Sequence, residues 1–172
     1  MTRNEGQASV ILDNVCKLIQ KKVHADNVLL VEKFAKALYS NMSKEDLAHR
    51  NDSDLYGAAL SLWNSLEKNN SDDAVVRVFN PEVAKDGWQS SHTIVEIIAK
   101  DMPFLVDSVR MAMTRANIAS HLLLHSPLKI QRDKNAKITG ISSLKAEQES
   151  TSTKTVFFIE IDRQTDAKVI ES

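Results

Sequence analysis

The chain has 172 residues, of which 42% are hydrophobic and 26% charged, and its formal net charge is −1. This length suits one ordinary domain or two small ones, and the composition is typical of a soluble globular protein. The balanced charge argues against a surface for nucleic acid or for an anionic membrane. The apolar runs are too short to span a bilayer, and the polar N-terminus shows no secretory signal. We therefore expect a cytoplasmic protein with no nucleic-acid or membrane partner.

Glycine and cysteine are both scarce. The four glycines, Gly6, Gly57, Gly87 and Gly140, are far apart in the sequence. A dinucleotide-binding loop or a P-loop needs clustered glycines so that backbone can approach phosphate. Cys16 is the only cysteine, so an intrachain disulfide or a cysteine metal cluster is ruled out. We therefore assign no cofactor-binding and no metal-binding residue to this segment.

Residues 1–70 have the periodicity of helices. Apolar side chains recur at helical spacing over 11–23, 28–38 and 55–66. The segment 43–50 adds a short helix that begins with a capping signal. Four helices with short connections predict a small helical bundle.

The polar tract 69–73 separates this region from a β-rich half at 74–172. Apolar and β-branched runs of strand length follow, at 74–79, 93–99, 118–132 and 156–162. An i, i+3, i+4, i+7 apolar stripe over 102–116 predicts a helix between the second and third runs. The order strand, helix, strand, strand is the beginning of a split βαβ, or ferredoxin-like, unit.

The final strand of that unit is absent from the sequence. We expect the open sheet edge to be exposed, covered by 74–79, or paired with another chain. The predicted fold class is therefore α+β, with an N-terminal helical bundle (1–70) followed by an incomplete ferredoxin-like split βαβ domain (74–172). The incompleteness also indicates the N-terminal piece of a longer polypeptide.

Two histidines and two glutamates are candidates for chemistry in the β-rich half. His121 and His125 lie four residues apart on a predicted strand, about 13 Å, which is too far for one zinc ion. Strand alternation places Glu96 and Glu160 with them on the sheet face that the helix leaves open. A flat, half-polar face offers no water-excluding site for acid–base catalysis. We interpret it as solvated or as an interface, and assign no catalytic residue.

The stretch DMPFLVDSVR (101–110) forms a strand-to-helix corner. Asp101 and Asp107 suit a helix start, where carboxylates cap N–H groups and match the dipole, and Pro103 fits the first turn. A helix N-terminus can also hold an anion, although two aspartates would repel one. We interpret this stretch as an effector or interface corner made of Asp101, Met102, Pro103, Phe104 and Asp107.

Several stretches resemble the N-terminal region of the large bacterial NAD-specific glutamate dehydrogenases. In the β-rich half they are VRVFNP (76–81), DGW (86–88), HTIVEIIAKDMPFLVDSV (92–109), ASHLLLH (119–125) and FFIEIDRQTD (157–166). In the helical part they are KALY (36–39), EDLAHR (45–50) and DLYGAALSLW (54–63). The family consists of very long chains that oxidise L-glutamate, with water and NAD⁺, to 2-oxoglutarate, ammonium and NADH. The resemblance implies that the catalytic domains lie downstream.

The same resemblance implies an ACT-like domain. The segment is then a non-catalytic regulatory or oligomerisation region, and NAD is a cofactor of the full-length enzyme only. Its implied partners are the downstream catalytic domains and sister subunits of a homo-oligomer. The alternative is an amino-acid-sensing ACT module that binds an effector at the corner 99–106. Amino-acid-binding ACT domains usually carry a glycine soon after the proline, whereas Phe104 follows Pro103 here, which favours packing between domains or subunits.

Overall fold

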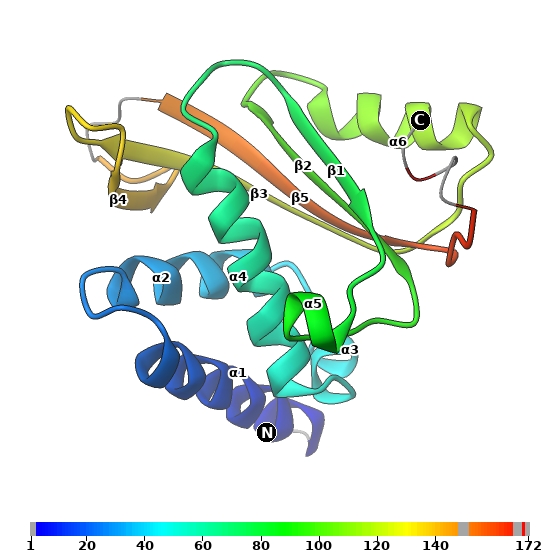
Figure 1. Ribbon diagram of the computed structural model, residues 1–172, viewed down its shortest axis with the longest axis horizontal. Helices are drawn as coiled ribbons and strands as arrows, with labels where there is room; N and C mark the ends of the chain where they lie inside the picture. The colour runs from blue at the N-terminus through cyan, green and yellow to red at the C-terminus, as the bar shows by residue number, and fades with distance from the viewer. Residues whose placement is uncertain (1–2, 148–151, 167–169, 171–172) are drawn as a thin grey trace.

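The computed structural model describes residues 3–147, 152–166 and 170 (Figure 1). Four helices come first: α1 (Arg3–Lys22), α2 (Val28–Tyr39), α3 (Lys44–Ala48) and α4 (Asp52–Lys68). The rest is β1 (Val75–Phe79), α5 (Val83–Asp86), β2 (Thr93–Lys100), α6 (Leu105–Arg115), β3 (Ser120–Arg132), β4 (Ile138–Ser143) and β5 (Ser152–Ile161). The predicted α+β class, with a helical region before a β-sheet domain, is confirmed.

The strands form one five-stranded antiparallel sheet in the order β1-β2-β5-β3-β4. Both β2 and β3 run antiparallel to the central β5, so they are parallel to each other and α6 is the crossover between them. This is the split βαβ arrangement. The remaining edge of β2 pairs with β1, from Val75 opposite Ile98 to Phe79 opposite Ile94. Of the three arrangements expected for this edge, coverage by the strand at 74–79 is therefore the one that the structure shows.

Helices lie on both faces of the sheet (Figure 1). Strand alternation is as predicted, because Val95, Ile97 and Ile159 pack with α6 while Ile94 and Ile98 face the other way. That other face is covered by the bundle, chiefly by α2 and α4. The expectation of a solvated or interface-forming open face was therefore wrong. Its apolar residues belong to the same hydrophobic cluster as the bundle helices.

This shared cluster bears on the division of the chain. The polar tract 69–73 does lie between α4 and β1. However, buried side chains of α4, such as Leu62 and Leu66, belong to one hydrophobic cluster with Ile98 of β2. The division of the chain into two domains, 1–70 and 74–172, therefore remains a prediction.

The loop between α5 and β2 is fixed to α4 by Trp88. A Cβ at Gly57, in the middle of α4, would lie 2.4 Å from both Cβ and Cγ of Trp88. Only glycine lets the indole approach the helix this closely. The buried ring also contacts Phe79 and Phe158, with centroid separations of 6.1 and 6.3 Å. This packing holds residues 88–92 over the junction of bundle and sheet.

Candidate functional site

The predicted corner begins its helix later than expected. Helix α6 starts at Leu105, not at Met102. The residue before a proline is disfavoured in the α region, which keeps Met102 out of the helix. Phe104 is the N-cap residue and has a left-handed backbone with φ 62°. The Phe104 side chain points toward solvent and is 79% exposed. Met102 is 50% exposed.

The two aspartates of the corner do different things. The Asp101 carboxylate accepts a hydrogen bond from the Thr155 hydroxyl at 2.7 Å, and its N–H donates to the Thr153 carbonyl at 3.0 Å. Asp101 therefore prolongs the β2–β5 pairing and does not cap α6, which corrects the sequence interpretation. Asp107 is exposed in the first turn of α6, where a carboxylate suits the helix dipole. The corner as an effector or interface site remains a prediction.

Glu96, expected on an open face, is buried against α4. Its carboxylate accepts hydrogen bonds from the hydroxyls of Ser61 at 2.7 Å and Ser65 at 3.1 Å. Arg77 on β1 lies 3.4 Å from it. Burial raises the pKa of the Glu96 carboxyl, and the Ser61 hydrogen bond and the Arg77 charge oppose that shift. The group is thus a structural polar contact between bundle and sheet.

Glu160 is also buried, and its partner comes from the turn between α3 and α4. The Arg50 guanidinium donates to both carboxylate oxygens, at 2.5 and 2.9 Å. This fork geometry is the strong form of a charge-assisted hydrogen bond. The Glu160 hydrogen bond is the main cause that raises the pKa of Arg50. Sequence reasoning missed Arg50, because it did not predict that Glu160 is buried. Only a buried carboxylate needs a cation from a distant part of the chain.

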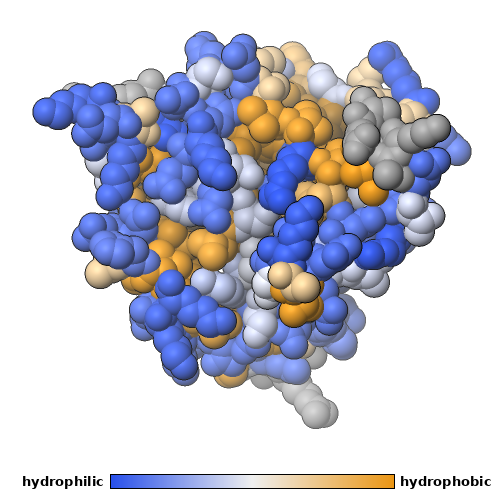
Figure 2. Space-filling view, viewed as in Figure 1, coloured by the Kyte–Doolittle hydropathy of each residue, from blue (hydrophilic) through white to orange (hydrophobic). Residues whose placement is uncertain are grey.

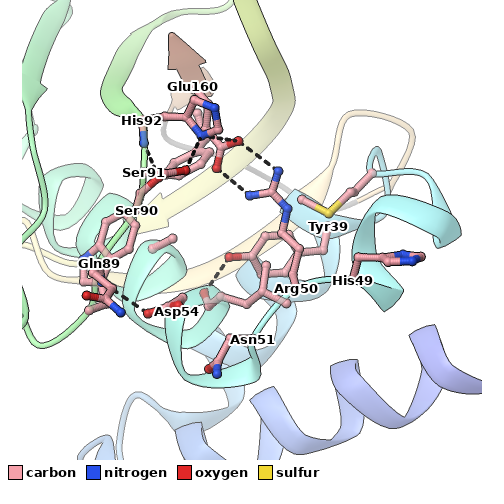
Figure 3. A pocket seen from close by; sticks show the side chains of 15 residues that line it. Tyr39, His49, Arg50, Asn51, Asp54, Gln89, Ser90, Ser91, His92 and Glu160 are labelled. Atoms are coloured by element: carbon pink, nitrogen blue, oxygen red, sulfur yellow. Dashed lines mark hydrogen bonds and ion pairs between the residues drawn. The ribbon is translucent and has the colours of Figure 1, made fainter. Parts of the chain in front are cut away.

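A cavity lies beside this ion pair, and we call it the junction pocket (Figure 3). It has a volume of about 600 Å³. The bundle supplies Tyr39, Arg50 and Asp54, the loop supplies 89–92, and β5 supplies Glu160. Tyr39 is buried and its hydroxyl donates to the Leu55 carbonyl at 2.5 Å. The pocket therefore joins an apolar floor to several polar groups.

The two histidines of β3 do not share a face. A bulge between Ser120 and Leu122 interrupts the alternation at His121. The His121 ring lies 4.4 Å from that of His92, which lines the junction pocket, and its Nε2 is 2.6 Å from Asp162. His125 pairs with Phe157 and so lies on the α6 face. The interpretation that placed both histidines with the glutamates was wrong for His125, because a sequence does not reveal the bulge.

Within residues 3–147, 152–166 and 170, no group of three or more His, Cys, Asp or Glu side chains is arranged to hold a metal ion. Nor does any helix in that part of the chain have the length and apolar character needed to cross a membrane. The bidentate bond to Arg50 occupies both oxygens of Glu160, so the junction pocket suits binding a polar molecule better than proton transfer.

Comparison with known proteins identifies relatives along nearly the whole chain. The family model described as the glutamate dehydrogenase ACT1 domain matches residues 34–172. The NAD-specific glutamate dehydrogenase of Halomonas elongata is 32% identical over 161 residues, which are 94% of this chain and 10% of that protein. The enzyme of the same name from Pseudomonas aeruginosa is 39% identical over 130 residues, 76% of this chain and 8% of that protein.

No solved structure matches the chain. The chain spans about a tenth of the length of the curated relatives it matches. The family match includes α4, the corner and all five strands. The chain therefore belongs to the family of glutamate dehydrogenase ACT1 domains.

Proposed function

We propose that the chain is the non-catalytic, N-terminal regulatory and assembly segment of an NAD-dependent glutamate dehydrogenase. The full-length enzyme would convert L-glutamate, NAD⁺ and water to 2-oxoglutarate, ammonium and NADH, in the cytoplasm. The observation that carries this proposal is the ACT1 match over 34–172, together with relatives named as NAD-specific glutamate dehydrogenases and about ten times longer.

The glycines of this segment do not fit NAD. Gly6 and Gly57 lie inside α1 and α4, Gly87 ends α5 with φ 78°, and Gly140 lies in β4. A dinucleotide needs glycines at a strand-to-helix turn, where backbone can approach the pyrophosphate. We therefore place NAD binding and hydride transfer on domains outside this segment.

The exposed apolar residues around α6 support a role in assembly. Met102, Phe104 and Met111 are each at least half exposed. An apolar groove of about 540 Å³ also runs between α6 and the β1 side of the sheet. Figure 2 shows apolar surface gathered over this region. Exposed apolar surface of this kind is typical of interaction sites, and we assign it to downstream domains or sister subunits of a homo-oligomer.

The test compares the full-length enzyme with a variant that lacks residues 1–172. We expect the purified 172-residue chain to form no NADH from glutamate and NAD⁺. We expect the deletion to change the number of subunits in the assembly, derived from the molar mass measured by light scattering, or the dependence of the rate on effectors. Glutamate oxidation by the chain alone would overturn the non-catalytic assignment. A deletion that leaves the number of subunits and the kinetics unchanged would overturn the regulatory and assembly role.

A further inference from the structure

We propose that the junction pocket binds a free α-amino acid, through its carboxylate on the Arg50 side and its ammonium at Asp54. The meaning of such binding rests on the regulatory function proposed above. The site is distinct from the corner 99–106, since it lies near Thr93 at the other end of β2 and on the opposite face of the sheet.

Size and shape permit a small ligand. The pocket of about 600 Å³ lies within the range of roughly 300–1,000 Å³ that is typical of small-molecule sites. Its floor includes Leu55, Trp88 and Phe158, which offer an apolar surface to a side chain. Its polar groups are concentrated on the two walls. This combination suits a molecule with charged groups at one end and a variable apolar or polar group at the other.

Arg50 has donors to spare. The bond to Glu160 uses two of the five N–H groups of the guanidinium, and the guanidinium makes no other hydrogen bond within the part of the chain that the structure describes. Its side chain is 30% exposed, as is that of His92 beside it. Ser91 completes this wall, with its hydroxyl 3.3 Å from Nδ1 of His92. A carboxylate fits the geometry of a guanidinium flanked by such donors.

Asp54 provides the opposite charge on the α4 wall. One of its carboxylate oxygens accepts the Gln89 N–H at 3.2 Å. The second oxygen has no hydrogen bond among the described residues, so it is available for an ammonium group. Figure 3 shows Asp54 on the α4 side of the pocket, and Arg50 with Glu160 toward the sheet. A ligand with both charges would satisfy both walls, whereas an amine or a carboxylic acid would satisfy only one.

Binding would join separate parts of the fold. Arg50 belongs to the turn before α4, Asp54 to α4 itself, and His92 to the loop that Trp88 holds on Gly57. A bound amino acid would therefore connect the bundle to the loop that leads into β2. This offers a physical route from ligand binding to the relative position of bundle and sheet.

The experiment measures binding to the 172-residue chain by calorimetry and by thermal shift. The probes are glycine, L-alanine, L-leucine, L-glutamate and L-lysine, each also as its N-acetyl and its amide derivative. Acetylation removes the ammonium charge, and amidation removes the carboxylate. We expect at least one free amino acid to bind, and both of its blocked derivatives to bind at least about 10-fold more weakly.

Variants then locate the site. Asp54→Asn and His92→Ala should each weaken binding about 10-fold or more, because the first removes a charge and the second a donor group without breaking the Arg50–Glu160 pair. Asp13→Asn is the matched control, since Asp13 is exposed on α1 and should leave affinity unchanged. Absence of binding by every free amino acid at 10 mM (about the weakest affinity these methods measure) would overturn the proposal. Equal binding of blocked derivatives, or wild-type affinity in both pocket variants, would also overturn it.

A second measurement separates this inference from the proposed function. The amino acid that binds is added to the full-length enzyme, and the initial rate of NADH formation is recorded for wild type and Asp54→Asn. Binding without any change in rate would confirm the site and contradict the amino acid as a regulator. No binding, combined with altered assembly in the deletion variant, would reject the site and leave the proposed function standing.

Discussion

The two faces of the sheet are covered in different ways. The bundle buries most of one face, with fully enclosed residues such as Leu62 and Ile98 and two buried glutamates that both have partners. On the other face α6 lies alone, and none of its residues is fully buried. Burying an aliphatic side chain contributes about 1.5–3 kcal/mol, so the bundle face supplies most of the apolar stabilisation.

This difference indicates which face of the sheet the segment covers with its own residues. The bundle face is closed by the chain's own residues, including its charges. The α6 face leaves Met102, Phe104 and Met111 exposed beside an apolar groove. Elements with few buried contacts open locally at the lowest free energy. We expect hydrogen exchange to be slower at the amides of α4 than at those of α6, and the following substitutions test that contrast.

The largest effect is expected for Arg50→Ala. It leaves Glu160 buried without its cation, and breaking a buried pair is strongly destabilising. Because Arg50 is partly exposed, we expect a loss of about 3 kcal/mol in the free energy of unfolding, measured by urea titration. Arg110→Ala removes a comparable exposed side chain from α6 and should change stability by less than about 0.5 kcal/mol. Equal effects of the two variants would contradict the asymmetry.

Gly57→Ala tests the contact that holds the pocket loop. Its new Cβ would collide with Trp88, and overpacking of this kind costs about 1–3 kcal/mol. Gly6→Ala is the control, because a Cβ there meets no atom within 4 Å and alanine is the better helix former. That variant should be neutral or up to about 1 kcal/mol more stable. Thermal unfolding of both variants checks the expectation, and a stabilised Gly57→Ala would show that Trp88 is free to move.

Phe104→Gly addresses the exposed face. Glycine adopts the left-handed backbone of this position freely, whereas phenylalanine is strained there. We expect a gain of up to about 1 kcal/mol in the free energy of unfolding. Phe104→Ala removes the same ring and keeps a Cβ, so it should not show this gain. If the ring also serves assembly, both variants should lower the molar mass of the full-length enzyme in light scattering.

The smallest expected effect is the pH dependence contributed by Glu96. Burial raises its pKa in the folded state above that in the unfolded chain, so the folded state holds the proton more tightly. The stabilising contribution of the protonated form is therefore complete at acid pH, and it is lost as pH rises through the raised pKa. Compared with wild type, Glu96→Gln should gain relative stability over that range, as measured by denaturant titrations at several pH values.

Ser61→Ala provides a directional control for this prediction. The Ser61 hydroxyl donates to the ionised carboxylate and so opposes the effect of burial. Its removal should raise the pKa of Glu96 further and extend the loss of stability to higher pH. A stability difference between Glu96→Gln and wild type that does not vary with pH would contradict both expectations.

Local patterns predicted most of the elements. The apolar stripes identified α1, α2 and α4, and the order of strands and helix identified the split βαβ unit with its inward-facing residues. These features depend on spacing within a few turns or on alternation along one strand. The strand β4 was missed, because Ile138–Ser143 contains a glycine, a threonine and two serines and has a weak β signal.

The candidate site could not be predicted in the same way. Arg50 and Glu160 are 110 residues apart, and nothing local to either one indicates the pairing. The helices that cover the second sheet face were missed for the same reason, since a glutamate in a strand favours the prediction of a solvent-facing position. One signal was present in the sequence. Ser61 and Ser65 lie four residues apart and so share a face of α4. Both hydroxyls donate to the buried Glu96 carboxylate.

The contact between Gly57 and Trp88 has a consequence for spectroscopy. The chain has two tryptophans, and both Trp63 and Trp88 are buried on the bundle side of the sheet. Intrinsic fluorescence will therefore report the docking of the bundle and, through Trp88, the filling of the junction pocket. Events at α6 will leave that emission largely unchanged. One cuvette measurement thus distinguishes a ligand on one face from a partner on the other, without any added label.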